Sequence, residues 1–326
     1  MAEMTYAEAA KLALQQEMVR DTRVWALGED LGSIGGIAGQ YRGLQAQFGR
    51  ERVLDTPISE STIMGAAVGA AICGTRPVVE LRYADFGLCA TDEIVNQAAK
   101  IRYMFNGQAR VPVVIRQPIG IQKGCAAQHS QSTEAWWVHV PGLVVVAPAT
   151  PADNHGLLKA AIRSDDPVIY LEHKELWPTR GEVDESRGPL RLGHAERLTD
   201  GNDVTIVTWS KMRHVCFASQ KILNEKGMSA EVIDLRTLWP WDRDMVLQSV
   251  QRTGRLLVVH EAVRVGGFGA EIAAEVGEAL WRELKGPVRR LGGPRSPVPY
   301  AEPLENLFRI TPEQVSNTAT KMVKES

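Results

Sequence analysis

The chain has 326 residues, of which 44% are hydrophobic and 23% are charged, and its formal net charge at pH 7 is -2. This composition excludes a disordered chain and a strongly basic nucleic-acid-binding surface, and the length predicts two domains of roughly 100–200 residues each. No apolar run reaches the roughly 18 residues of a membrane span, and charged residues interrupt the first twenty. We therefore expect neither a membrane helix nor a secretory signal, and a cytoplasmic location.

The first half of the chain alternates between predicted helices and strands. One helix begins after Thr5, another covers 91–105, and a third begins after the N-cap residue Thr150. Short, continuously apolar segments between the helices are predicted to be strands, at 24–27, 77–81, 111–116, 143–147 and 168–172. Such strands, separated by helices, are typical of a parallel sheet covered on both faces, so the predicted fold class is α/β.

The periodicity fails between 174 and 201, where prolines and glycines are mixed with charged residues. This stretch predicts a boundary between two domains, 1–185 and 186–326. The second domain is also predicted to be α/β, with strands at 204–208, 230–234 and 256–260 and helices at 213–226, at 270–284 and from Thr311 onwards. The four cysteines form no C-x-x-C pair, and we expect them to be buried and reduced.

Open α/β sheets bind ligands beyond the carboxyl ends of their strands, so the loops that follow strands are the candidate sites. The first is the turn DTPISE, in which Pro57 keeps Thr56 extended and Ser59 is a suitable N-cap. Glu60 is then predicted to lie in the first turn of an Ala/Gly-rich helix. The residues alone leave two interpretations open, a reactive carboxylate or one that only interacts with the helix dipole.

Two further segments follow strands, 83–86 (YADF) and 117–134, which contains His129 within QHSQS. A histidine among amides and hydroxyls can be held in one tautomer and suits proton transfer, and a hydrogen-bonded structural loop is the alternative. The glycine-rich segment 32–39 fits no dinucleotide motif, and we interpret it as a lid or a partner contact. The glycines at 266–269 favour a structural turn, and no transition-metal motif occurs.

Six motifs are recognisable together: DTPISE, YADF followed by DEIVNQAAKIRYM, AAQHSQS, PGLVVVAPATPAD, AAIRSDDPVIYLEHK and VVHEAVRVGGFGAEI. In this order, and over nearly the whole chain, they resemble the β subunit of the thiamine-diphosphate-dependent decarboxylating (E1) component of 2-oxo acid dehydrogenase complexes. The resemblance implies a pyrimidine-binding domain joined to a transketolase C-terminal-type domain. It also implies an oxidoreductase that decarboxylates a 2-oxo acid, or cleaves acetoin, and reductively acylates a lipoyl group.

The resemblance also assigns roles to residues. Glu60 matches the glutamate that hydrogen-bonds the aminopyrimidine ring of thiamine diphosphate and favours its imino tautomer. Phe86 matches the aromatic residue that stacks on this ring, and His129 matches the histidine that serves acyl transfer to the lipoyl group. In some members backbone carbonyl groups of the β subunit hold a potassium ion, and the matching positions are Val113, Ala161, Ile162, Ser164 and Asp166.

Related enzymes bind the diphosphate and Mg²⁺ through a GDG motif and a later asparagine, and this chain has no GDG. The resemblance therefore implies that an α subunit completes the site, in an α2β2 heterotetramer that serves a lipoyl-bearing acyltransferase core. The form AAQHSQS resembles pyruvate- and acetoin-type members first and the branched-chain type second. Two alternatives are a non-catalytic assembly subunit and the pyrimidine half of a split transketolase or deoxyxylulose-phosphate synthase.

Overall fold

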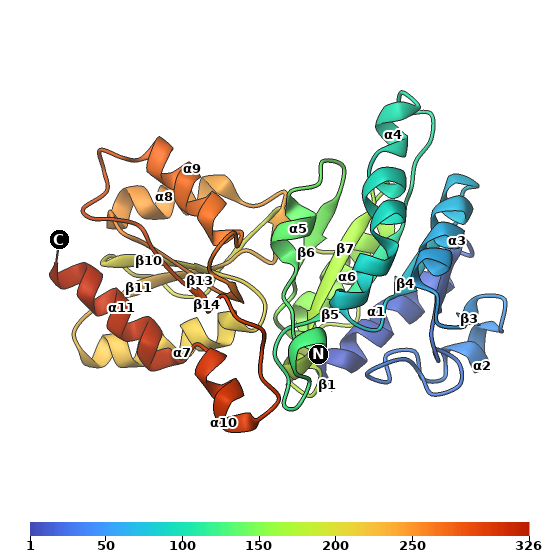
Figure 1. Ribbon diagram of the computed structural model, residues 1–326, viewed down its shortest axis with the longest axis horizontal. Coiled ribbons are helices and arrows are strands. Elements are labelled where there is room, and N and C mark those ends of the chain that lie inside the picture. The colour runs from blue at the N-terminus through green and yellow to red at the C-terminus, as the bar shows by residue number, and fades with distance from the viewer. Residues whose placement is uncertain (326) are drawn as a thin grey trace. The chain divides into compact units, whose positions relative to one another are not determined.

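The computed structural model describes residues 1–325 (Figure 1). The chain divides into two compact units, and the segment Gly120–Ala135 belongs to the second unit although it follows a strand of the first. The first unit comprises Met1–Ile119 and Trp136–Leu192, and the second comprises Gly120–Ala135 and the chain from Gly193 onwards. No helix within residues 1–325 is long and apolar enough to cross a membrane.

The first unit is built on a parallel sheet. Its strands lie in the order β6 (Val144–Val146), β7 (Val168–His173), β5 (Val114–Ile119), β4 (Arg76–Glu80), β2 (Val24–Gly28) and β3 (Val53–Asp55). β5 and β7 are buried along their whole length, and this burial includes the polar residues Arg116 and Gln117 of β5 and Glu172 and His173 of β7. The carboxyl ends of β2 and β4 lie side by side, since Gly28 pairs with Glu80.

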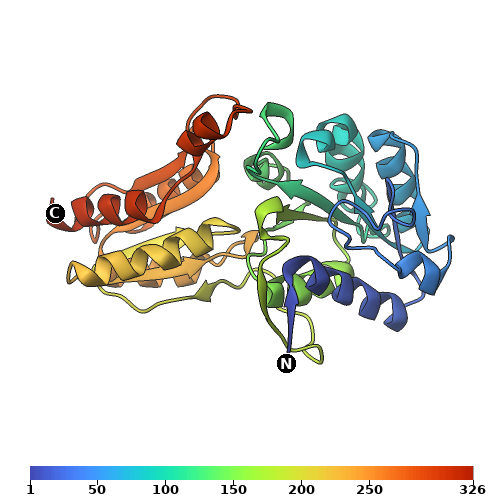
Figure 2. The same ribbon diagram turned by 90° about the horizontal axis from the view of Figure 1, so that it is seen from below.

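Helices cover both faces of this sheet. α1 (Tyr6–Arg20) and α6 (Pro151–Arg163) pack against each other on one face, and α3 (Glu60–Ile72) lies on the other (Figure 2). α1 begins with a capping box in which the Glu8 N–H donates to Thr5 Oγ1 at 3.1 Å. A short antiparallel pair, β1 (Ala2–Thr5) and β8 (Arg180–Val183), holds the start of the chain. The side chains of α1 and α6 form one hydrophobic core with those of the strands.

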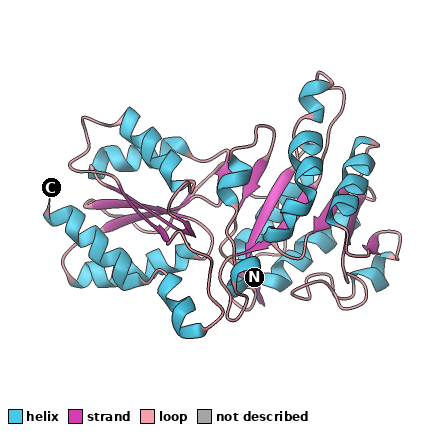
Figure 3. Ribbon diagram, in the orientation of Figure 1, coloured by secondary structure: helices cyan, strands magenta, loops and turns pink. Residues whose placement is uncertain are grey.

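The second unit repeats the α/β plan. Its sheet has the order β14 (Arg289–Gly293), β13 (Leu256–Val263), β10 (Val204–Thr208), β11 (Ala230–Asp234) and β9 (Glu196–Arg197), and only β9 is antiparallel to its neighbour. α8 (Arg243–Thr253) and α9 (Gly269–Ala279) lie over one face, and α7 (Met212–Glu225) and α11 (Pro312–Lys324) over the other (Figures 1 and 3). The predicted α/β class is confirmed for both units.

Several predicted elements differ from the structure. The single helix predicted over 91–105 is wrong: a π-helical turn, η2 (Glu93–Ala98), is followed by a separate short helix, α4 (Ile101–Met104). The break coincides with the close approach of Gly142, whose added Cβ would lie 2.0 Å from the Ala99 carbonyl oxygen. A π-helical turn such as η2 is an ordinary site of such an interruption.

The expected burial of the cysteines is also wrong in part. Cys216 is fully buried in the second core, but Cys73 and Cys89 are exposed and Cys125 is half-buried. Cys73 follows the last residue of α3, whose small residues Gly65 and Gly69 also face outward in the isolated chain. Small neighbours indicate close packing, but they do not indicate whether the packed surface is internal or contacts another molecule.

Candidate active site

Glu60 is the first residue of α3, as predicted, and it is half-buried. The turn before it is fixed by the Thr56 N–H, which donates to the Gly28 carbonyl oxygen at 3.0 Å, at the carboxyl end of β2. Ser59 occupies the N-cap position, but within the described chain its side chain makes no cap bond and donates instead to Thr62 Oγ1 at 2.7 Å. The first turn of α3 therefore has no side-chain cap from Ser59. The Glu60 carboxylate lies in this turn, where the partial positive charge of the helix dipole stabilises it.

A second carboxylate, Glu29, lies beside Glu60 and was missed in the sequence. Burial first, and then the charge of Glu60, raises the pKa of Glu29, whereas Arg82 opposes the rise. Glu29 directly follows β2, so its position at the carboxyl edge of the sheet is the signal that could have found it. Two neighbouring carboxylates can share or transfer a proton.

Phe86 lies in a 3-10 segment, η1 (Ala84–Ala90), that packs against α3. The Phe86 ring contacts the edge of the Tyr83 ring at a centroid distance of 5.5 Å, and the Lys174 ammonium lies 5.3 Å from the centroid of Tyr83. These contacts fix the orientation of the aromatic pair. Glu60 and Phe86 thus lie on two elements that pack together within the first unit.

Gln117, at the carboxyl half of β5, is a second residue that the sequence did not single out. It is fully buried, yet neither polar atom of its amide has a hydrogen-bond partner among residues 1–325. Its Nε2 would lie 2.6 Å from a Cβ added to Gly87, so any side chain at position 87 would require the Gln117 amide to shift. A buried amide without partners is costly, which indicates that a ligand or water completes its hydrogen bonds.

The glycine-rich segment 32–39, interpreted from sequence as a lid or partner contact, is anchored within the first unit. The Ile37 N–H donates to Glu80 Oε1 at 3.1 Å, and a Cβ on Gly36 would lie about 3 Å from the same carboxylate. Glu80 is buried at the end of β4, and this burial raises its pKa to about 7. The anchor ties the segment to the edge of the sheet that carries Glu29.

His129 ends the short turn η3 (Ala127–His129) in the segment Gly120–Ala135, which we call the His129 loop. Its Nδ1 lies 2.5 Å from the Gln128 carbonyl oxygen, and because a carbonyl only accepts, Nδ1 carries the proton and Nε2 is the basic nitrogen of the neutral ring. Ala126, with φ 55° and ψ -157°, adopts a conformation that glycine favours and that costs an alanine about 1–3 kcal/mol. Such strain persists only where the surrounding structure enforces it.

The carbonyl groups matched to a potassium site do not fit a potassium ion as they are arranged. The Arg76 guanidinium donates to the carbonyl oxygens of Ile162 at 3.0 Å and Ser164 at 2.8 Å. Main-chain and hydroxyl donors engage the other three, the carbonyl groups of Val113, Ala161 and Asp166. A potassium ion could take the Ile162 and Ser164 oxygens only if Arg76 moved away, because two cations would otherwise share the same acceptors.

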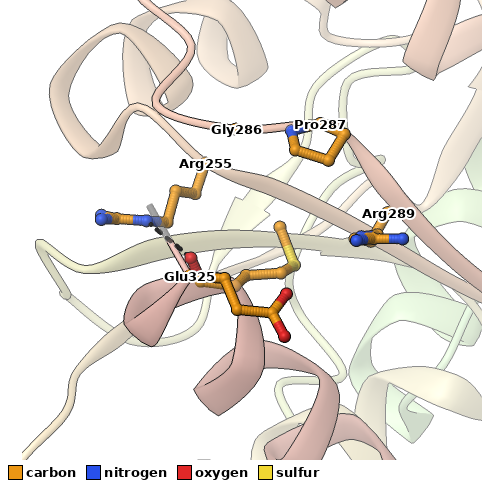
Figure 4. A pocket seen from close by; sticks show the side chains of 6 residues that line it. Arg255, Gly286, Pro287, Arg289 and Glu325 are labelled. Atoms are coloured by element: carbon orange, nitrogen blue, oxygen red, sulfur yellow. Dashed lines mark hydrogen bonds between the residues drawn. The ribbon is translucent and has the colours of Figure 1, made fainter.

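One small pocket of the second unit contains none of the predicted site residues (Figure 4). It lies where the end of α11 meets the starts of β13 and β14. Arg255 donates to the Met322 carbonyl oxygen at 3.1 Å and to that of Asp203 at 3.1 Å, so this guanidinium holds the end of α11 in place. Its contacts are those of a structural arginine.

The residues of the first unit fit the aminopyrimidine end of thiamine diphosphate. Glu60 offers a carboxylate, Phe86 an aromatic face, and Gln117 a buried amide with an unused donor and acceptor. An aminopyrimidine presents an aromatic face together with its own donors and acceptors, which is the complement of this set. His129 belongs to the second unit, so the predicted site residues are divided between the two.

Comparisons with known proteins agree with this fold. The transketolase pyrimidine-binding domain matches residues 2–179, and the transketolase C-terminal domain matches residues 193–315. A solved split-gene transketolase, described as an inactive β4 tetramer, superimposes with a TM-score of 0.80 over 98% of both chains. Its sequence identity is 24%, so this likeness shows the fold alone.

Three relatives are more similar in sequence. The 2-oxoisovalerate dehydrogenase subunit beta of Bacillus subtilis is 42% identical over 97% of both chains. The acetoin:2,6-dichlorophenolindophenol oxidoreductase subunit beta of Cupriavidus necator is 45% identical over 96% of this chain and 95% of its own. The mitochondrial pyruvate dehydrogenase E1 subunit beta-2 of Oryza sativa is 45% identical over 94% of this chain and 82% of its own. The resemblance inferred from the motifs is confirmed, and the chain belongs to the family of E1 β subunits of 2-oxo acid and acetoin dehydrogenases.

Proposed function

We propose that this chain supplies Glu60, Phe86 and His129 to a thiamine-diphosphate site that it shares with an α subunit. The observation that carries the proposal is the placement of Glu60 at the start of α3, against the segment that holds Phe86, at the carboxyl edge of a parallel sheet. Ligands of open α/β sheets bind at this edge. A non-catalytic assembly subunit would have no need of this pairing.

The cofactor, when bound, supplies an electron sink for the bond that breaks beside the substrate carbonyl. Glu60 would hold a proton at its carboxylate against a pyrimidine nitrogen, and Glu29, whose pKa is raised by burial and by the charge of Glu60, lies beside it. Phe86 would orient the ring by stacking on it. His129, with Nε2 as the basic nitrogen, would move a proton during acyl transfer to a lipoyl group.

The need for an α subunit as partner follows from the absence of a diphosphate-binding motif in the sequence. Without a GDG motif, the chain is expected to leave the diphosphate and Mg²⁺ to the α subunit, most simply in an α2β2 heterotetramer. The assembled component would act in the cytoplasm and transfer its acyl group to a lipoyl-bearing acyltransferase core. The potassium ion is not part of the proposal, because Arg76 contacts two of the matched carbonyl groups.

The substrate is a small 2-oxo acid or acetoin. The relatives are named for 2-oxoisovalerate, acetoin and pyruvate, at 42%, 45% and 45% identity, so overall similarity does not separate them. The form AAQHSQS around His129 favours pyruvate or acetoin over a branched-chain acid. Sugar phosphates, the substrates of a split transketolase, are disfavoured. The relatives at 42–45% identity are named for 2-oxo acids and acetoin, whereas the split-gene transketolase is 24% identical.

The experiment is to reconstitute the complex with its α subunit and measure turnover of pyruvate, acetoin and 2-oxoisovalerate. Glu60→Gln preserves the size of the side chain and removes the carboxyl group that can exchange a proton, and we expect turnover of the preferred substrate to fall by at least roughly a hundredfold. Glu51→Gln, at an exposed position of the same unit, serves as the matched control and should leave turnover unchanged. Near-normal turnover by a folded Glu60→Gln complex would remove Glu60 from the mechanism.

A further inference from the structure

The His129 loop leaves the first unit at β5, yet its main chain is hydrogen-bonded by carboxylates of the second unit. The Ile121 N–H donates to Glu261 Oε1 at 2.7 Å, and the Gly124 N–H donates to Glu305 Oε2 at 3.1 Å. Glu261 lies near the end of β13, and Glu305 ends α10 (Glu302–Glu305). Two acceptors from separate elements therefore fasten the first turn of the loop.

The two carboxylates are themselves held in place. Glu305 is 1% exposed, and its other oxygen accepts from Arg309 Nη2 at 2.6 Å, which presents Oε2 to Gly124. Lys211 lies beside the same group: burial lowers its pKa, and the charges of Glu261 and Glu305 oppose that change. Two anions and two cations thus balance one another, and hydrogen bonds to ionised groups are stronger than neutral ones.

The other end of the loop is also fixed. The Gly120 N–H donates to the Gln131 carbonyl oxygen at 3.1 Å, which closes the loop on itself. Beyond it, the buried Glu134 accepts from Trp209 Nε1 at 3.1 Å, and Trp209 follows β10 of the second unit. His129 therefore lies between two anchors, and the unfavourable backbone of Ala126 is enforced from both sides.

We propose that Glu261 and Glu305 are positioning residues for His129, and that the second unit, through these two carboxylates, sets where the acyl-transfer histidine lies. Both carboxylates contact the loop through its main-chain N–H groups. The proposal rests on the proposed role of His129 for its functional consequence, but the anchoring itself is testable without any reaction.

Trypsin cleavage after Lys123 can report whether the anchored part of the His129 loop opens. The Lys123 side chain is 73% exposed, while the residues on both sides of it are anchored through Ile121 and Gly124. A protease must bind several extended residues, so trypsin can cut after Lys123 only when the anchors open. Cleavage at the exposed Lys226 of the full-length chain serves as an internal reference.

We expect Glu261→Ala and Glu305→Ala each to speed cleavage after Lys123 by roughly tenfold relative to Lys226, as the loss of a charge-assisted hydrogen bond implies. Glu261→Gln and Glu305→Gln keep an acceptor oxygen and should restore slow cleavage. Glu302→Ala is the matched control, because it removes only the exposed ion pair with Lys123 and should leave the ratio almost unchanged. If Glu305→Ala fails to fold, Glu261→Ala still decides the question.

In the reconstituted complex, the two alanine variants should lower the reaction with a lipoyl acceptor more than decarboxylation followed with an artificial electron acceptor. Unchanged cleavage after Lys123 in both folded alanine variants would overturn the proposal. Faster cleavage with equal losses in the two activity assays would instead keep the anchors and remove His129 from acyl transfer. The failure of this inference and the failure of the proposed function are therefore distinguishable.

Discussion

Glu134 should make the second unit less stable as the pH rises, and Glu134→Gln should remove this dependence. Burial raises the pKa of Glu134 to about 7, against an ordinary value of 4.5, and the Trp209 hydrogen bond only partly offsets the rise. Because the folded state holds the proton more tightly, the penalty is absent below pH 4.5 and fully present above pH 7. At about 1.4 kcal/mol per pH unit, the two pKa values correspond to about 3 kcal/mol.

The measurement is the free energy of unfolding by urea for both proteins between pH 5 and pH 8. Glutamine keeps an oxygen that can accept from Trp209. Its NH2 group takes the place of Glu134 Oε2, which has no hydrogen-bond partner among residues 1–325, so the substitution also changes the free energy of unfolding by an amount that does not depend on pH. The informative quantity is therefore how the difference in free energy of unfolding between the variant and the unsubstituted protein changes with pH. This difference should favour the variant increasingly up to about pH 7. Glu283→Gln, at an exposed position of the same unit, is the control. A difference that stays flat over this range would refute a raised pKa at Glu134.

Two further predictions concern the candidate site. His129→Ala should depress the overall reaction with a lipoyl substrate much more than decarboxylation followed with an artificial electron acceptor, because a group acting in one transition state leaves earlier steps nearly intact; equal losses on one preparation would contradict this role. Exchanging NaCl for KCl at equal ionic strength should leave the melting temperature of the chain unchanged, because Arg76 already donates to the carbonyl groups of Ile162 and Ser164. A potassium-specific increase would show that Arg76 moves aside.

Much of the fold could be predicted because its strands are rich in apolar residues and its helices have clear start signals. β10 and β11 have the predicted bounds, α6 begins as predicted, and Thr150 accepts from the Asp153 N–H at 3.1 Å as expected of an N-cap. The π-helical turn η2 and the break before α4 were not predicted, and the segment that approaches them closely, at Gly142, lies about 40 residues further along the chain. Local patterns carry no record of such contacts.

The site was predictable to the extent that its chemistry lies in side chains of recognisable motifs. Glu60 is at the predicted helix start, but Glu29 and Gln117 become site candidates only when strand neighbours and burial are known. The anchors of the His129 loop join residues 140 and 181 positions apart and use main-chain donors, which leave no sequence pattern. The contact of Arg76 with carbonyl oxygens was unpredictable for the same reason.

The central claim is that this chain contributes one half of a thiamine-diphosphate site, and calorimetry tests it most directly. Thiamine diphosphate with Mg²⁺ should be titrated into the purified chain and into the chain reconstituted with an α subunit that carries the GDG motif. We predict no measurable binding by the chain alone and tight, Mg²⁺-dependent binding by the complex, because the chain offers Glu60 and Phe86 to the pyrimidine but has no diphosphate motif. Binding by the chain alone at about micromolar affinity would contradict the account.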